Sequence, residues 1–287
     1  MRYEAPETTA DAVALLTGEQ GIARVLAGGT DLLVQLKSGR LEPDLVVDVK
    51  KIDAMRSITA EDGGFRIGAG VSSAEMSEHD GLCAMWPGVV EAAALIGSTQ
   101  VQGRATMVGN LCNASPAADS VPAMVAAGAT IRIVGPNGSR DIPVENLNSG
   151  PGKTTLAKGE LVESVYLPAR PAGSSDAYLR FIPRTEMDIA VVGVGVSLTL
   201  DGSGTCTAAR VGLGAVAPTV LLVEDAAKAL IGTKCDEAAL EAAAAACSAA
   251  ANPIDDKRGT VDYRIKVAGV LTRRAAAIAR DRAEANA

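Results

Sequence analysis

The stretch "VLAGGTDLLVQLKSG", Val25 to Gly39, decides how the N-terminal part of the chain is interpreted. Val25 and Leu26 have the apolar character of a buried strand end, and a helical pattern follows Asp31. Two adjacent glycines and a threonine lie between the two. Glycine lets the backbone approach a ligand closely, and consecutive N–H groups form an anion-binding concavity. The stretch is therefore either an ordinary turn or a loop that binds a phosphate group.

Composition and charge exclude several classes of protein. The 287 residues are enough for one large domain or two ordinary ones. The net charge of −7, without a Lys/Arg cluster, argues against nucleic acid or an anionic membrane as the main partner. No apolar run approaches the roughly 20 residues that span a bilayer. The start "MRYEAPETTADAVALL" has acids and a proline where a signal peptide needs a cationic and then an apolar region, so we expect a cytoplasmic protein.

Few residues are available for metal or acid–base chemistry. The five cysteines are widely spaced without a C-x-x-C pair, which argues against a disulfide framework or an iron–sulfur cluster. The single histidine, His79, leaves little material for a zinc site or a histidine base, and we expect it on a helix surface. No nucleophile–base pair is apparent. Any difficult chemistry must therefore come from a cofactor.

The first two sections of the chain predict mixed helices and strands. Residues 1–54 begin with a capped helix, continue through the strand–turn–helix above and end in the strand "DLVVDVK", a small βαβ-like unit. In residues 55–173, "GFRIGAGVSSAEM" predicts a strand and then a helix capped by Ser72 or Ser73. "PGVVEAAALIGS" predicts a helix ending at Gly97, and "ATIRIVGPNGSRDIPV" predicts a hairpin.

The last section has a different order of elements. "PARPAGSSDA", residues 168–177, is the best candidate for a linker because it is rich in Pro, Gly and Ser. "DIAVVGVGVSLTLDGSGTCTAARVGLGAVAP" predicts three strands. Three helices follow, "TVLLVEDAAKALIG", "DEAALEAAAAACSAAA" and "VDYRIKVAGVLTRRAAAIARDRA". A small antiparallel sheet followed by a helical bundle makes the fold class α+β.

Three other glycine-containing segments are weak nucleotide motifs. "NLNSGPGKTTL", residues 146–156, resembles the end of a P-loop, but Leu147 stands where that motif needs its first glycine. We expect a polar loop there. "GVGV" at 193–196 and "GLGAVAP" at 212–218 lie in strand patterns without a following helix, so they fail the context of a dinucleotide fingerprint. Their glycines are expected to pack the sheet.

A second glycine-containing loop strengthens the phosphate hypothesis. "RATMVGNLCNASPAAD" runs from Arg104 to Asp119. Thr30 and Thr106 offer hydroxyl donors, and Asn110 offers an amide. Two such loops from different sections could hold a pyrophosphate between them, although a Gly-Gly pair before a helix is often only a turn.

Four segments together resemble one family over essentially the whole chain. They are "LAGGTDLLVQLKSG", "GSTQVQGRATMVGNLCNASPAADSVPAMVA", "YLRFIPRTEMDIAVVGVGV" and "RGTVDYRIKVAGVLTRRA", in this order. The chain is similar to the FAD-binding medium subunit of the molybdenum hydroxylases, the xanthine dehydrogenase and carbon monoxide dehydrogenase superfamily. The resemblance implies a two-lobed FAD-binding domain of the vanillyl-alcohol-oxidase type at 1–173, with lobes of about 1–54 and 55–173. It implies a C-terminal flavoprotein domain at 174–287.

The resemblance also implies which residues bind FAD. The family's pyrophosphate loop and its flanks correspond to Leu26, Ala27, Gly28, Gly29, Thr30, Asp31 and Leu32. Its second loop, T-x-G-G-N, corresponds to Thr106, Met107, Val108, Gly109 and Asn110. Val108 departs from this pattern, because the family usually has the first of the two glycines at this position. The departure affects one close backbone contact of the loop.

Four further positions have an implied role and an ordinary alternative. Asp119 corresponds to a carboxylate on the ribose or adenine side, or it is a helix N-cap. Ile96, and Val162 or its neighbour Leu161, correspond to apolar residues near the isoalloxazine, or they are core residues. Arg180 corresponds to a basic residue near the flavin, or it is a surface or interface charge.

The family implies an electron-transfer role for the chain. An FAD subunit would receive electrons from the 2Fe–2S clusters of a small partner subunit, beside a large molybdopterin subunit, in a dimer of heterotrimers. It would pass them to an external acceptor such as NAD, a quinone or oxygen. One alternative is a stand-alone FAD-dependent oxidoreductase. Another is a non-catalytic scaffold that has lost FAD, for which Val108 is the argument. The substrate would be set by the molybdenum subunit.

Overall fold

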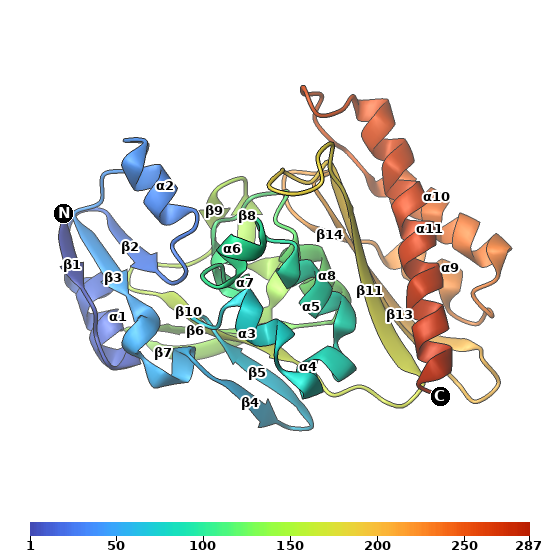
Figure 1. Ribbon diagram of the computed structural model, residues 1–287, viewed down its shortest axis with the longest axis horizontal. Coiled ribbons are helices and arrows are strands. Elements are labelled where there is room, and N and C mark those ends of the chain that lie inside the picture. The colour runs from blue at the N-terminus through green and yellow to red at the C-terminus, as the bar shows by residue number, and fades with distance from the viewer.

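A computed structural model describes residues 1–287 as three consecutive parts along the chain. In Figure 1 an N-terminal lobe lies at one end, a second lobe in the middle, and a C-terminal sheet with long helices at the other end. Each part has its own sheet. The mixed arrangement confirms the predicted α+β class. No helix combines the length and apolar character needed to cross a membrane.

The N-terminal lobe is a three-stranded parallel sheet of order β1–β3–β2. Its elements are β1 (Arg2–Glu4), α1 (Thr9–Gly18), β2 (Ala23–Leu26), α2 (Leu32–Lys37), β3 (Leu45–Asp48), η1 (Val49–Lys51) and η2 (Asp53–Met55). The βαβ-like unit is confirmed. The expectation that Val25 is buried was wrong, because β2 is an edge strand and leaves Val25 38% exposed.

The second lobe is a five-stranded antiparallel sheet of order β4–β5–β10–β6–β7, with short helices beside it. Its strands are β4 (Ile58–Glu61), β5 (Gly64–Gly68), β6 (Thr130–Gly135), β7 (Gly138–Pro143) and β10 (Leu161–Leu167). Its helices are α3 (Ser73–Ser77), α4 (Asp80–Met85), α5 (Pro87–Ala94), α6 (Thr99–Gln102), α7 (Met107–Cys112), α8 (Ser120–Ala126) and η3 (Val144–Asn146). A separate small hairpin joins β8 (Asn148–Gly150) to β9 (Lys153–Thr154).

Local sequence signals decide several of these boundaries. Ser72 caps α3 and forms a capping box with Glu75, so the first of the two predicted caps is correct. The β6–β7 hairpin has Pro136 and Asn137 in its turn, as predicted. His79 was expected on a helix surface, but it caps α4 instead: its Nδ1 accepts the Leu82 N–H at 3.1 Å.

The C-terminal sheet is antiparallel and four-stranded. Its strands are β11 (Ser174–Phe181), β12 (Val192–Leu200), β13 (Cys206–Gly214) and β14 (Leu221–Leu222), and its helices are α9 (Glu224–Leu230), α10 (Glu237–Ala250) and α11 (Val261–Ala285). Three strands were expected within residues 188–218, but this stretch contains only two, β12 and β13. The predicted linker 168–177 was wrong at its end, because β11 begins at Ser174. The predicted helix from Thr219 was wrong at its start, because Leu221 and Leu222 pair with β13.

Helices cover both faces of this sheet, and glycines allow one of the contacts. Helix α11 packs on β11 and β12, while α5 and α8 approach from the second lobe (Figure 1). A Cβ at Gly195 or Gly212 would lie 2.6 or 2.2 Å from the Pro122 carbonyl oxygen in α8. The backbone of α8 therefore lies directly on the strands, which confirms the sheet-packing role expected for these glycines.

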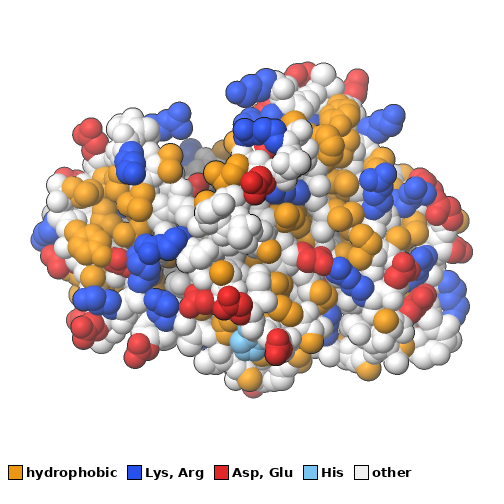
Figure 2. Space-filling model, in the orientation of Figure 1, with side chains coloured by type: hydrophobic (Ala, Val, Ile, Leu, Met, Phe, Trp, Pro, Cys, Tyr) orange, Lys and Arg blue, Asp and Glu red, His pale blue; other side chains and the backbone are white.

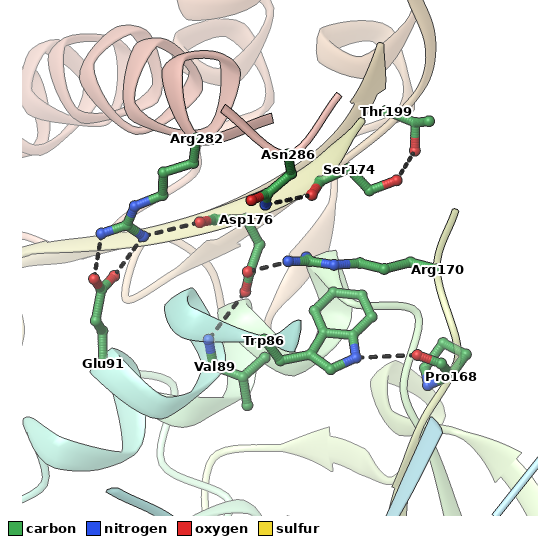
Figure 3. Close-up of polar contacts among 10 residues, drawn as sticks. All are labelled: Trp86, Val89, Glu91, Pro168, Arg170, Ser174, Asp176, Thr199, Arg282 and Asn286. Atoms are coloured by element: carbon green, nitrogen blue, oxygen red, sulfur yellow. Dashed lines mark hydrogen bonds and ion pairs between the residues drawn. The ribbon is translucent and has the colours of Figure 1, made fainter. Parts of the chain in front are cut away.

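A buried polar cluster connects α5 to the start of the C-terminal sheet (Figure 3). Asp176 in β11 is 2% exposed and accepts the Val89 N–H at 3.0 Å. It also pairs with Arg170 at 3.1 Å, and the Arg170 guanidinium lies 4.4 Å from the centroid of the Trp86 ring. Trp86 donates its indole N–H to the Pro168 carbonyl. Burial raises the pKa of Asp176 to about 6, although Arg170 acts in the opposite direction.

The end of α11 contributes to the same junction. Arg282 pairs with Glu91 in α5 and donates to the Asp176 carbonyl oxygen at 3.0 Å. Asn286 donates to the Ser174 carbonyl oxygen at 3.2 Å. The last helix of the chain is thus hydrogen-bonded both to β11 and to the second lobe.

Candidate functional site

A cavity of about 750 Å³ lies between the N-terminal lobe and the second lobe. The surface in Figure 2 is hollowed between these two parts. The walls come from the β2–α2 loop, α7, the 152–160 segment and the start of β10. All but four of the residues predicted to bind a cofactor line it: Ala27, Gly28, Gly29, Thr30, Asp31, Leu32, Ile96, Thr106, Val108, Gly109, Asn110, Leu161 and Val162.

The two glycine loops meet at one wall of this cavity. A Cβ at Gly28 would lie 1.8 Å from the carbonyl oxygen of Arg104, so only glycine lets the first loop pack against the backbone that leads into the second. Gly29 has a φ of +79°, in the left-handed region that favours glycine. The two adjacent glycines are therefore required for different reasons. Gly28 allows the close approach to the Arg104 backbone, and Gly29 allows the left-handed turn.

The first loop presents a row of free backbone donors. The N–H groups from Ala27 to Leu32 donate to no acceptor in the chain, and neither does the Thr30 hydroxyl. Most backbone donors in folded proteins have partners. A run of consecutive donors beside a cavity has the chemistry of an anion site.

The second loop adds donors from α7. The Thr106 hydroxyl oxygen accepts the Gly109 N–H at 2.9 Å, which caps α7 and leaves its own proton available. The Asn110 side-chain oxygen Oδ1 accepts from the Ser120 N–H and hydroxyl at 3.2 and 2.8 Å. Its amide N–H groups thus remain available to the cavity. Val108 is helical, without a positive φ, so its backbone does not require the glycine usual in the family.

Apolar side chains line the same cavity. Ile96, Leu161 and Val162 line the cavity, and their exposed fractions are 8%, 2% and 4%. These three residues belong both to the buried core and to the wall of the cavity. The combination of polar donors and an apolar wall fits a cofactor that carries both a pyrophosphate and an aromatic ring.

Four predicted residues do not line the cavity. Met107 is 1% exposed and buried. Leu26 is buried beneath the first loop. Asp119 and Arg180 instead pair with each other at 2.7 Å, and the Tyr178 hydroxyl donates to the other Asp119 oxygen at 3.1 Å. The Asp119 side chain does not cap α8. Burial raises the pKa of Asp119 to about 6, against the lowering effect of Arg180 and Tyr178.

The sequence analysis did not predict several other residues of the cavity wall. Gln35 donates to the Asn113 side-chain oxygen at 3.3 Å, which links α2 to α7. Gln35 lies one helical turn after Asp31, so helical spacing was a usable signal. Gly152 and Thr154 also line the cavity. They belong to the segment that resembles the end of a P-loop, and the expectation of a polar loop was wrong at Thr154, which lies in β9.

Cys112 also lines the cavity. Its side chain is half-buried. Burial raises the pKa of its thiol to about 12, so the thiol is protonated at neutral pH. Cys112 therefore presents no thiolate to the cavity.

Two protein-family models match the chain over most of its length. Residues 1–170 match the FAD binding domain in molybdopterin dehydrogenase, and residues 177–279 match the CO dehydrogenase flavoprotein C-terminal domain. The carbon monoxide dehydrogenase medium chain of Afipia carboxidovorans is 36% identical over 282 residues, covering 98% of this chain and 97% of that relative. The xanthine dehydrogenase FAD-binding subunit of Escherichia coli O157:H7 is 29% identical over 274 residues, covering 95% and 93%.

A solved structure has the same fold. Reconstituted CO dehydrogenase from Oligotropha carboxidovorans matches with a TM-score of 0.93 and 36% identity, covering 98% of each chain. The fold, the two family models and the relatives agree with the resemblance identified from the sequence. The chain belongs to the FAD-binding medium subunits of the molybdenum hydroxylases, the oxidoreductase superfamily of xanthine dehydrogenase and carbon monoxide dehydrogenase.

Proposed function

We propose that the cavity between the first two lobes binds FAD, with the pyrophosphate against the first glycine loop. The observation that carries this is the row of free N–H donors from Ala27 to Leu32 beside the cavity. The Thr30 and Thr106 hydroxyls and the Asn110 amide would donate to the same phosphates. Ile96, Leu161 and Val162 would contact the flavin ring and exclude water from it.

We further propose that the chain is the electron-transfer subunit of a heteromeric molybdenum hydroxylase. When bound, FAD exchanges single electrons with metal clusters and electron pairs with an acceptor. Relatives named as medium chains or FAD subunits support a complex with a large molybdopterin subunit and a small 2Fe–2S subunit. The expected assembly is a dimer of such heterotrimers, and the acceptor would be NAD, a quinone or oxygen.

We also propose that the chain divides into an FAD-binding domain at 1–173 and a C-terminal domain at 174–287. Two separate hydrophobic cores support this division. One lies between Ala12 and Leu167, with Tyr178 of β11 as its single contribution from the C-terminal part, and the other lies between Ala177 and Ala283.

Titration of FAD into the purified apoprotein tests the proposed site. Quenching of flavin fluorescence should saturate at one FAD per chain. Gly28→Ala should raise the dissociation constant at least about tenfold, because its Cβ would force the two loops apart. Gly103→Ala is the matched control, since a Cβ there meets nothing within 4 Å, and it should bind as the wild type does. A folded wild-type chain that takes up no FAD would contradict the proposal and favour a scaffold that has lost its cofactor.

Stopped-flow absorbance tests the electron path. The FAD-loaded chain, mixed with a reduced 2Fe–2S subunit of a related complex, should lose its flavin absorbance as the clusters are reoxidised. A chain that instead oxidises a small organic substrate without any partner would identify a stand-alone oxidoreductase.

A further inference from the structure

Lys50 lies directly behind the first glycine loop. Strands β2 and β3 are parallel neighbours with Leu26 opposite Asp48, so the segments leaving both strands meet at one edge of the sheet. Lys50, in the 3₁₀ turn after β3, reaches across and donates its ammonium to the Ala27 carbonyl oxygen at 3.0 Å. Lys50 itself is not part of the cavity wall.

The ammonium of Lys50 is held in this position by two residues. Asp48, 6% exposed, accepts from the Lys50 Nζ at 2.7 Å and from its backbone N–H at 3.0 Å. The Tyr3 hydroxyl donates to the second Asp48 oxygen at 2.6 Å. Burial acts to raise the pKa of Asp48, but the hydrogen bonds from Lys50 and Tyr3 outweigh it and lower this pKa. Asp48 is therefore ionised at neutral pH and fixes the lysine.

The contact with Ala27 sets the direction of the next donor. In a trans peptide the C=O and the following N–H point in opposite directions, and the chain has no cis peptide bond. Since the Ala27 C=O faces Lys50, the Gly28 N–H faces away from Lys50. Gly28 lines the cavity and its N–H has no acceptor in the chain. A hydrogen bond from an ammonium also polarises the peptide and strengthens its N–H as a donor.

We propose that Lys50, held by Asp48 and Tyr3, is a positioning residue that directs and polarises the Gly28 N–H toward the pyrophosphate of FAD. The inference rests on the proposed FAD site and assigns a residue outside the cavity to it. It requires that loss of Lys50 weakens ligands containing a pyrophosphate and spares those without one.

Binding of three probes to Lys50→Met distinguishes positioning from a general structural role. FAD and ADP both carry a pyrophosphate, whereas riboflavin does not. We expect the dissociation constants of FAD and ADP to rise by a similar factor, about tenfold, with riboflavin affinity unchanged. Lys50→Arg keeps a cationic donor and should restore most of the FAD affinity. Lys51→Met is the matched control, because Lys51 is the exposed neighbour and makes no side-chain hydrogen bond or ion pair.

Two results would overturn the inference. One is a folded Lys50→Met variant with wild-type affinity for FAD. The other is an equal loss of FAD, ADP and riboflavin binding, which would mean that the whole site is distorted. If Lys50→Met does not fold, Tyr3→Phe removes one support of Asp48, and unchanged FAD and ADP affinity in that variant would overturn the inference. Failure of the wild type to bind FAD would instead reject the proposed function itself.

Discussion

At the scale of single residues, the carboxylate of Asp119, at the end of the second glycine-containing segment, is buried and forms an ion pair. Its two oxygens accept hydrogen bonds from Arg180 and Tyr178. The side chains of Asp119 and Arg180 are at most 10% exposed. Two charges taken out of water depend on each other, because either one alone would be buried without compensation. Loss of either partner should therefore destabilise the junction of α8 with β11 by more than the loss of one exposed ion pair would.

Asp119→Ala should destabilise the protein by about 3–5 kcal/mol, because it leaves the Arg180 guanidinium buried and unpaired. Urea unfolding followed by circular dichroism measures this. Asp141→Ala is the control: its pair with Arg132 is 41% and 34% exposed, and its loss should cost at most about 1 kcal/mol. Equal effects of the two variants would show that the Asp119 pair is not a buried charge pair.

Residues in local motifs could be predicted from the sequence, whereas residues that act across the sheet could not. Gly28 and Thr106 belong to short segments whose composition indicates their chemistry. The contact of Lys50 with Ala27 depends on the register of β2 against β3, which no local pattern encodes. Asp119 and Arg180 were expected to act separately, because their separation along the chain hides that they form a pair.

At the scale of elements, the contact of α8 with β12 and β13 is set by glycines. A Cβ at Gly212 would come within 2.2 Å of the Pro122 carbonyl oxygen, which is backbone and cannot rotate away. Helix and sheet would have to separate. The hydrophobic residues on both sides would then lose contacts that a close-packed core cannot replace.

Gly212→Ala should lower the free energy of unfolding by about 1–3 kcal/mol through overpacking. Gly202→Ala makes the same chemical change in the turn between β12 and β13, where a Cβ meets nothing within 4 Å. It should be neutral within about 0.5 kcal/mol. Thermal unfolding of both variants at equal concentration compares them directly, and an unchanged melting temperature for Gly212→Ala would contradict the close contact.

Elements with strong local signals were predictable, and elements formed by pairing were not. The capping box at Ser72 and the hairpin around Pro136 follow from nearby residues. The start of β11 at Ser174 does not, because Gly, Ser and Asp are typical of loops. Eight consecutive pairings with β12 override that preference.

At the scale of the whole molecule, the C-terminal part is joined to the second lobe through the buried cluster around Asp176 (Figure 3). The folded protein holds the Asp176 pKa at about 6, above its ordinary value of 3.8. The folded state therefore binds a proton more tightly than the unfolded chain between these values. By linkage, the contribution of Asp176 to stability improves as pH falls from about 6 toward about 4. Asp119, with its pKa also raised to about 6, acts in the same direction.

The pH dependence of unfolding should accordingly differ between the wild type and Asp176→Asn. An asparagine does not titrate, so the stability of the wild type relative to this variant should rise by about 2 kcal/mol between pH 7 and pH 4.5. Urea unfolding at closely spaced pH values measures the difference. Asp141→Asn is the control, because Arg132 lowers the pKa of Asp141 and its effect should change only below this window. A constant difference between wild type and Asp176→Asn would mean that Asp176 keeps an ordinary pKa, and that Arg170 compensates fully for its burial at the junction.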